Sequence, residues 1–134
     1  MEENLVKMEW KSADGNTVKK VVFAVVDLSS LGEIGVKRLD VRDVYSVLEH
    51  YISETYDGRK PILLAEIFSG DFIPYCTDLK RWIRENKINI DGYTFVREAR
   101  ELIGRFIYDR IVFPEVKVLE IVFRHCAVWY LLWE

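Results

Sequence analysis

The stretch TVKKVVFAVVDL, residues 17–28, decides the fold because its middle, residues 21–26, is apolar without interruption. Side chains of a β-strand alternate between the two faces of a sheet, so an uninterrupted apolar run indicates a strand covered on both faces. The sequence therefore predicts a central strand with helices on at least one face of its sheet. Upstream, NLVKMEW (4–10) also has the composition of a strand, and Asp14-Gly15 between the two runs is a strong turn signal. We predict that the two runs pair as a hairpin.

Downstream of this strand, the sequence predicts a helix and then a second buried strand. Asp40 is a suitable N-cap for the helix, whose apolar residues recur at helical spacing: Val41, Val44, Tyr45, Leu48, Tyr51, Ile52 and Tyr56. The run ILLAEIF (62–68), bounded by Pro61 and Gly70, is short and apolar like the strand before it. A strand, a helix and a strand in this order predict a right-handed crossover to a parallel neighbour.

Two more helices are predicted in the second half of the chain. Thr77 is a good N-cap for the run DLKRWIRENK (78–87). A longer helix from about residue 94 has an apolar stripe that we expect to be buried: Phe95, Ala99, Leu102, Ile103, Phe106 and Ile107. The connection RENKINIDGYTF (84–95) fits either a helix-turn-helix or a tight hairpin at Asp91-Gly92. We favour a helix end, a short extended turn and the start of the long helix.

The C-terminal run PEVKVLEIVFRHCAVWYLLWE (114–134) permits two interpretations. Its polar residues Lys117, Glu120 and Arg124 follow helical spacing, but its many β-branched and aromatic residues favour a strand, which is our prediction. The fold class is therefore α+β, as a single domain spanning 1–134. We expect a mixed sheet of about four strands, built from the N-terminal hairpin and a parallel crossover, packed with about three helices.

Composition narrows the class of protein. The chain of 134 residues is half apolar and 31% charged, as is typical of one folded domain. Two cysteines are too few for a disulfide framework, and no leader-like segment begins the sequence, so we expect an intracellular, cytoplasmic protein. Glutamine is absent and charged and branched residues are frequent, a bias that resembles thermophile proteins. No phosphate-binding glycine motif or paired zinc-ligand spacing indicates a cofactor or a metal.

Basic residues are concentrated in one part of the chain. The protein carries a net charge of −3, yet residues 78–110 contain eight basic and six acidic side chains. If this region forms a helix pair, six of the cations would contact backbone phosphates of a nucleic acid: Lys80, Arg81, Arg84, Lys87, Arg97 and Arg100. The alternative is an amphipathic helix pair whose charges are solvated and paired with each other. A small nucleic-acid-binding or regulatory factor is our leading functional hypothesis.

Two acidic residues suggest an enzyme instead. Asp27 ends one predicted parallel strand and Asp71 follows the next, so both would face the crevice where α/β sheets bind ligands. Two carboxylates there would hold Mg²⁺ for phosphodiester chemistry. Aspartate after a buried strand is more often a turn former, and no further acid or lysine has suitable spacing. We therefore expect a protein without catalytic activity.

Aromatic residues crowd the C-terminus and provide the second functional hypothesis. Trp129, Tyr130 and Trp133 would form an exposed patch if the terminal strand lies at the edge of the sheet. Such an edge would favour a homo-oligomer, specifically a homodimer, and a non-catalytic module for protein interactions. Alternatively, the same aromatic residues close the core of a small domain.

Overall fold

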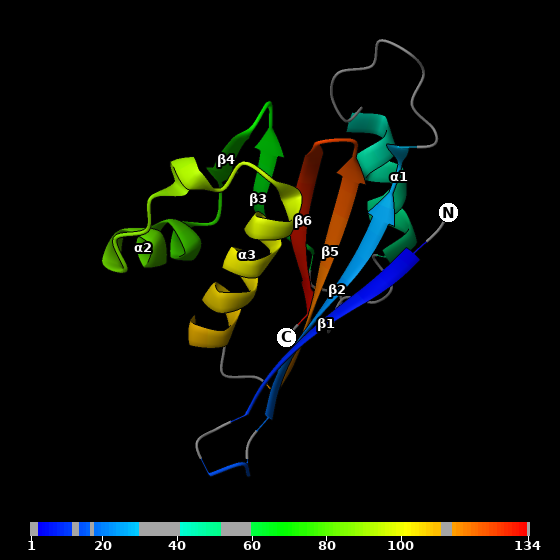
Figure 1. Cartoon of the computed structure of the whole chain (residues 1–134). Helices are drawn as coiled ribbons and strands as arrows, with labels where there is room; N and C mark the ends of the chain where they lie inside the picture. The colour runs from blue at the N-terminus through cyan, green and yellow to red at the C-terminus, as the bar shows by residue number, and fades with distance from the viewer. Residues whose placement is uncertain are drawn as a thin grey trace.

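The computed structural model describes residues 3–11, 14–16, 18–29, 41–51, 60–110 and 114–133. It contains a six-stranded mixed sheet of order β1-β2-β5-β6-β3-β4, with α1 on one face and α2 and α3 on the other (Figure 1). The strands are β1 Glu3–Lys11, β2 Val18–Asp27, β3 Ile62–Phe68, β4 Asp71–Pro74, β5 Glu115–Phe123 and β6 Cys126–Trp133. The helices are α1 Val41–Tyr51, α2 Thr77–Glu85 and α3 Val96–Arg110, with a 3₁₀ turn, η4 Ile90–Gly92, between the last two. The predicted α+β class is confirmed, whereas the expected number of about four strands is too low.

The N-terminal hairpin forms as predicted. β1 pairs antiparallel with β2 along its whole length, and Gly15 in the connecting turn has a φ of 74° that glycine adopts without strain. β2 is internal to the sheet, and all six residues from Val21 to Val26 are buried. The uninterrupted apolar run therefore marks a strand covered on both faces.

The predicted parallel neighbour of β2 is wrong. β2 pairs in parallel with β5, while β3 lies beyond β5 and β6 in the sheet. After β3 the chain continues through β4, α2 and α3 before it returns with the hairpin β5-β6, which fills the space between β2 and β3. This apolar hairpin gains most by burying both of its faces at the centre of the sheet.

Two strands were missed because their turns are poorly marked or very short. Residues 114–133 form two strands rather than one, joined by a turn at Arg124-His125 in which Arg124 has a φ of 55°. Neither residue is a usual turn former. β4 follows β3 through Ser69-Gly70, both with positive φ, as in a two-residue hairpin of type I′.

The core is divided by the sheet into two layers. Phe23, Trp82, Phe106 and Trp129 belong to the layer under α2 and α3, and Tyr51 belongs to the layer under α1. The stripe predicted for α3 is buried at Ala99, Leu102, Ile103, Phe106 and Ile107. Phe95 is an error in that prediction, because it precedes the helix and is 65% exposed.

The segment between α2 and α3 is neither a hairpin nor a short helix-turn-helix turn. α2 has Cys76, not Thr77, as its N-cap and Asn86 as its C-cap, after which Lys87 adopts a left-handed φ of 53°. η4 follows, where the Asn89 side chain accepts a hydrogen bond from the Asp91 amide at 3.1 Å. The favoured helix end, turn and new helix are confirmed, with a 3₁₀ turn in place of extended backbone.

Other sequence expectations lie outside the described residues. These are the N-cap Asp40 and the helical positions Ile52 and Tyr56, all of which flank α1. Among the helices of the described segments, none is long and apolar enough to cross a membrane.

Candidate functional site

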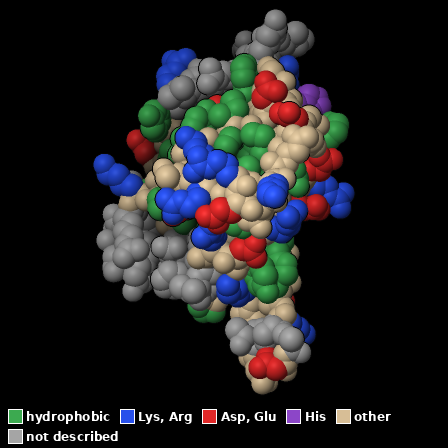
Figure 2. All heavy atoms as spheres, turned by 90° about the vertical axis from the view of Figure 1, so that its left-hand side faces the viewer, with side chains coloured by type: hydrophobic (Ala, Val, Ile, Leu, Met, Phe, Trp, Pro, Cys, Tyr) green, Lys and Arg blue, Asp and Glu red, His purple; other side chains and the backbone are tan. Residues whose placement is uncertain are grey.

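The outer face of α2 carries a group of exposed cations. Leu79, Trp82 and Ile83 are the buried residues of this nine-residue helix, so its remaining positions point away from the core. Lys80, Arg81 and Arg84 occupy those outward positions, and Lys87 follows the helix end; all four side chains are exposed. We call these four residues the α2 basic face. Figure 2 looks onto the side of the molecule that carries α2 and shows Lys and Arg side chains gathered across its middle, with acidic side chains among them.

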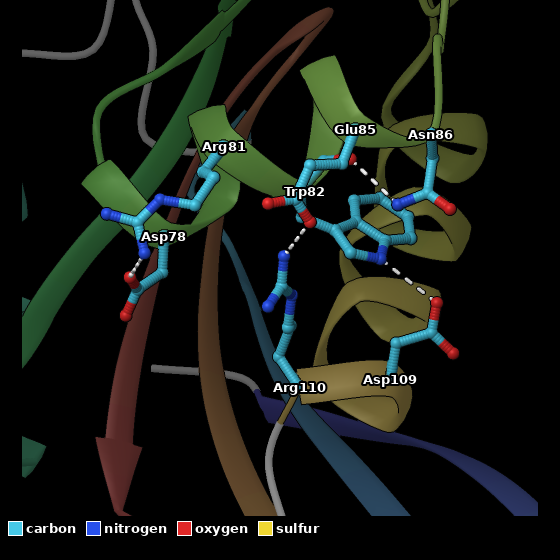
Figure 3. Close-up of polar contacts among 7 residues, drawn as sticks. All are labelled: Asp78, Arg81, Trp82, Glu85, Asn86, Asp109 and Arg110. Carbon is cyan, nitrogen blue, oxygen red and sulfur yellow. Dashed lines mark hydrogen bonds and ion pairs between the residues drawn. The ribbon is translucent and has the colours of Figure 1, made fainter.

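Polar contacts fix α2 against α3 and engage the acidic residues beside the basic face (Figure 3). Glu85 forms an ion pair with Arg110, and the indole Nε1 of Trp82 donates to Asp109 Oδ2 at 3.0 Å. Asn86 Nδ2 donates to the Trp82 carbonyl at 2.8 Å, which closes the C-terminal end of α2. Glu85 is thereby directed towards α3, away from the α2 basic face.

One acidic residue lies within reach of the basic face. Asp78 Oδ1 is 3.7 Å from Arg81 Nη1, on the side of α2 away from α3 (Figure 3). Both side chains are more than half exposed, so this pair contributes little to stability and dissociates readily. Within the described segments, no side chain forms an ion pair with Lys80, Arg84 or Lys87.

The other two predicted phosphate contacts lie on α3. Arg97 is exposed near the start of α3. Arg100 is turned inward, where its Nε and Nη2 donate to the two carboxylate oxygens of Glu120 at 2.8 and 2.6 Å. Of the six predicted residues, three therefore lie on α2 and Lys87 lies just after it. Arg97 lies on the neighbouring helix α3, and Arg100 forms an internal ion pair.

Glu120 is the centre of a buried polar cluster. Glu120 lies on β5 in the middle of the sheet, and its side chain has no exposed surface. Besides the two hydrogen bonds from Arg100, it accepts a third from Trp129 Nε1 at 2.6 Å. The hydrogen bonds with Glu120 raise the pKa of Arg100, burial opposes this, and the charges of Glu120 and Glu101 raise it further. Both carboxylate oxygens of Glu120 are hydrogen-bonded and Arg100 lies against them, as a buried ion pair requires.

The aromatic patch expected at the C-terminus does not lie at a sheet edge. β6 is flanked by β5 and β3, and Trp129 is completely buried. Tyr130 is half-buried on the opposite face of β6, and the side chain of Trp133 lies outside the described part of the structure. The edges of the sheet are β1 and β4 instead.

The two aspartates of the enzyme hypothesis are far apart. Asp27 ends β2 and Asp71 begins β4, with β5, β6 and β3 between them. Four strand spacings of about 4.8 Å amount to roughly 19 Å, too far for two carboxylates to share a metal ion. Asp27 instead accepts the Ser29 amide at 2.8 Å, as in a turn. The described residues contain no cluster of three or more His, Cys, Asp or Glu side chains.

A pocket that the sequence did not indicate lies on the α1 side of the sheet. It has a volume of about 270 Å³ and is lined by α1, β3 and β6 together with Tyr75, which follows β4. Among the described lining residues, Glu66 on β3 contributes the only carboxylate, and the hydroxyl of Tyr75 donates a hydrogen bond to Glu66 Oε1. Tyr45 and Tyr130 also line this pocket. The feature of the sequence that could have indicated this pocket is Glu66, an acidic residue inside the apolar run ILLAEIF.

Comparison with known proteins finds no relative for this chain: no family model, curated protein or solved structure matches it significantly. The α2 basic face and the pocket are therefore the features that bear on function.

Proposed function

We propose that the protein binds nucleic acid through the backbone phosphates, with the α2 basic face as the contact surface. The observation that carries the proposal is the arrangement of Lys80, Arg84 and Lys87, which are exposed, lie at intervals of four and three residues, and have no ion-pair partner in the described structure. Lys80 and Arg84 lie along one side of α2, about 5 to 6 Å apart, and Lys87 follows just after the end of this helix. Arg81 extends the same surface.

Phosphate contacts suit these residues because exposed lysine and arginine side chains bind phosphate oxygens without desolvating a buried group. Such contacts release counterions from the nucleic acid and do not read the base sequence. Arg97 is an additional contact at the margin of the surface, whereas the bonds between Arg100 and Glu120 remove Arg100 from the proposal. The rest of the protein supplies the excess of acidic charge, so binding would occur in one orientation.

Fluorescence anisotropy with labelled duplex and single-stranded DNA and RNA tests this proposal. Four phosphate contacts predict that affinity falls about 100-fold between about 50 and about 200 mM salt. The double variant Lys80→Glu/Arg84→Glu should bind at least tenfold more weakly at low salt and show a shallower salt dependence, because two contacts are lost and two repulsions are added.

A matched control has the same change in net charge on another surface. Lys7→Glu/Lys11→Glu alters two exposed lysines of the edge strand β1, far along the sheet from α2. This control should bind like the wild type. Equal weakening in both double variants would show that only net charge matters and would contradict the proposed surface. Absence of binding by the wild type at low salt would overturn the proposal itself.

A further inference from the structure

The pocket on the α1 side of the sheet combines one carboxylate with several aromatic rings. Glu66 projects from β3 to this side, as does Val128, its partner in the register of β6. Tyr45, Phe68, Tyr75 and Tyr130 line the same space, with apolar side chains between them. Tyr45 and Tyr75 are 61% and 41% exposed, so they stand at the rim, whereas Phe68 and Tyr130 are more deeply placed.

Among the described residues that line the pocket, none carries a positive charge opposite Glu66. Glu66 accepts a hydrogen bond from the Tyr75 hydroxyl, and the ten described residues that line the pocket include no Lys, Arg or His. A half-buried carboxylate without an opposite charge is unfavourable in an apolar setting unless something cationic approaches it. The described lining therefore contributes a negative potential, which favours cationic ligands over anionic ones.

The aromatic rings add to this potential. The face of an aromatic ring is negative, and tyrosine and phenylalanine attract a cation held within about 6 Å of the ring centre. Burial raises the pKa of the Tyr130 hydroxyl, with further contributions from the nearby Tyr45 and Glu66, so Tyr130 is neutral near pH 7 and its ring can face a cation. A carboxylate among several rings suits an organic cation better than a metal ion, which needs more oxygen ligands than one carboxylate supplies.

We propose that this pocket binds a small soluble organic cation that carries an alkylated ammonium group. Glu66 faces the positive charge, the rings of Tyr45, Tyr75 and Tyr130 surround it, and the apolar lining contacts its alkyl groups. The volume of about 270 Å³ is just below the range usual for drug-sized ligands, which indicates a compact ligand. The pocket lies on the opposite face of the sheet from α2, so this inference is independent of nucleic-acid binding.

Isothermal titration calorimetry with choline is the direct test, because choline carries a compact trimethylammonium group. The matched ligand is its uncharged isostere dimethylbutanol, in which a quaternary carbon replaces the nitrogen. Choline should bind at least tenfold more tightly than this alcohol, because the two ligands have the same shape and differ only in the positive charge. Equal affinity for the two ligands, or no binding of choline at concentrations up to about 10 mM, would overturn the proposal.

Two variants locate the site and one serves as a control. Glu66→Gln keeps the size of the side chain and should weaken choline binding about tenfold through loss of the charge. Tyr45→Ala removes an exposed ring from α1, where alanine favours the helix, and should weaken binding severalfold in a protein that folds normally. Phe95→Ala removes an exposed ring on the other face and should change nothing. Wild-type affinity in both pocket variants would contradict the assignment.

The source of the cation is tested in the same experiment. Vesicles of phosphatidylcholine present the same trimethylammonium group on a lipid, and we expect them not to displace choline. Displacement by the vesicles would overturn the assignment to a soluble ligand and point to a lipid headgroup.

Discussion

Glu120 and Glu66 each interrupt an apolar stretch of a strand in the same sheet, yet they face opposite sides and have different surroundings. Glu120 is completely buried and accepts three hydrogen bonds, two from Arg100 and one from Trp129. Glu66 is half-buried, accepts one hydrogen bond from Tyr75 and lies beside a pocket. The first carboxylate is saturated by the protein itself, whereas the second has capacity left for a ligand.

This difference separates a structural role from a binding role in physical terms. A buried charge needs its hydrogen bonds and its counter-charge in the folded protein, because no solvent replaces them. A partly exposed charge keeps its hydration until a ligand replaces the water. Removal of a partner should therefore destabilise the fold around Glu120, and affect mainly ligand binding around Glu66.

The largest effect is expected when Arg100 is removed. Arg100→Ala leaves the Glu120 carboxylate buried without its counter-charge, which costs about 3–5 kcal/mol in the free energy of unfolding. Urea denaturation followed by circular dichroism measures this loss. Arg97→Ala, at an exposed position of the same helix, is the control and should change stability by less than about 0.5 kcal/mol.

A double substitution distinguishes an unpaired charge from lost packing. Arg100→Leu/Glu120→Leu removes both charges and should be more stable than Arg100→Ala, because no uncompensated ion remains. If the double variant is less stable than Arg100→Ala, packing around the pair rather than the unpaired charge causes the loss of stability. That result would contradict the proposed difference between Glu120 and Glu66.

The second largest effect is expected at Trp129. Trp129→Phe removes the indole donor to Glu120 and leaves a small cavity. Trp82→Phe is a matched control, because Trp82 is equally buried but donates to Asp109, an exposed carboxylate that water can solvate. We expect Trp129→Phe to lower the free energy of unfolding by about 1–2 kcal/mol more than Trp82→Phe. Equal losses would mean that the donor to Glu120 adds nothing beyond the volume of the ring.

The sequence predicted those features that depend on local pattern and missed those that depend on distant partners. The apolar run of residues 21–26 is sufficient to predict a central strand, and the apolar stripe from Ala99 to Ile107 is sufficient to predict α3. Glu120 was grouped with Lys117 and Arg124 as a polar set at helical spacing. Its real partners, Arg100 and Trp129, lie 20 and 9 residues away and meet it only in the assembled sheet.

The candidate sites follow the same rule. The α2 basic face lies within eight consecutive residues, Lys80 to Lys87, on and just after one short helix, so the sequence alone brings its four cations together. The pocket collects Tyr45, Glu66, Tyr75 and Tyr130 from three separate parts of the chain, and no local spacing connects them. In the sequence, Arg100 cannot be distinguished from exposed arginines such as Arg97. Its different role becomes visible only when α3 packs on β5 and Arg100 meets Glu120.

A small effect on stability is expected at Glu66. Glu66→Gln keeps the shape of the side chain and an acceptor for the Tyr75 hydroxyl, so the free energy of unfolding should change by less than about 1 kcal/mol. Urea denaturation alongside Arg100→Ala provides the comparison. A loss as large as that of Arg100→Ala would show that Glu66 is a structural residue, and would weaken the case for a ligand in its pocket.

The smallest effect is a change in alkaline titration at Tyr130. Burial and the charges of Tyr45 and Glu66 raise the pKa of Tyr130 in the folded protein above the ordinary value of 10.0. The folded state therefore retains this proton longer than the unfolded state, so the contribution to stability is complete below pH 10.0 and is lost as the pH rises through the folded pKa. Tyr130→Phe should remove this part of the alkaline loss, and one tyrosine that ionises above pH 10.0 should disappear from a titration of tyrosinate absorbance. In Glu66→Gln the same tyrosine should ionise at lower pH than in the wild type, because one of the negative charges that oppose ionisation is gone. If the titration of Tyr130 is unchanged in Glu66→Gln, the Glu66 carboxylate does not affect the pocket electrostatically. Glu66 and Glu120 would then differ only in how deeply they are buried.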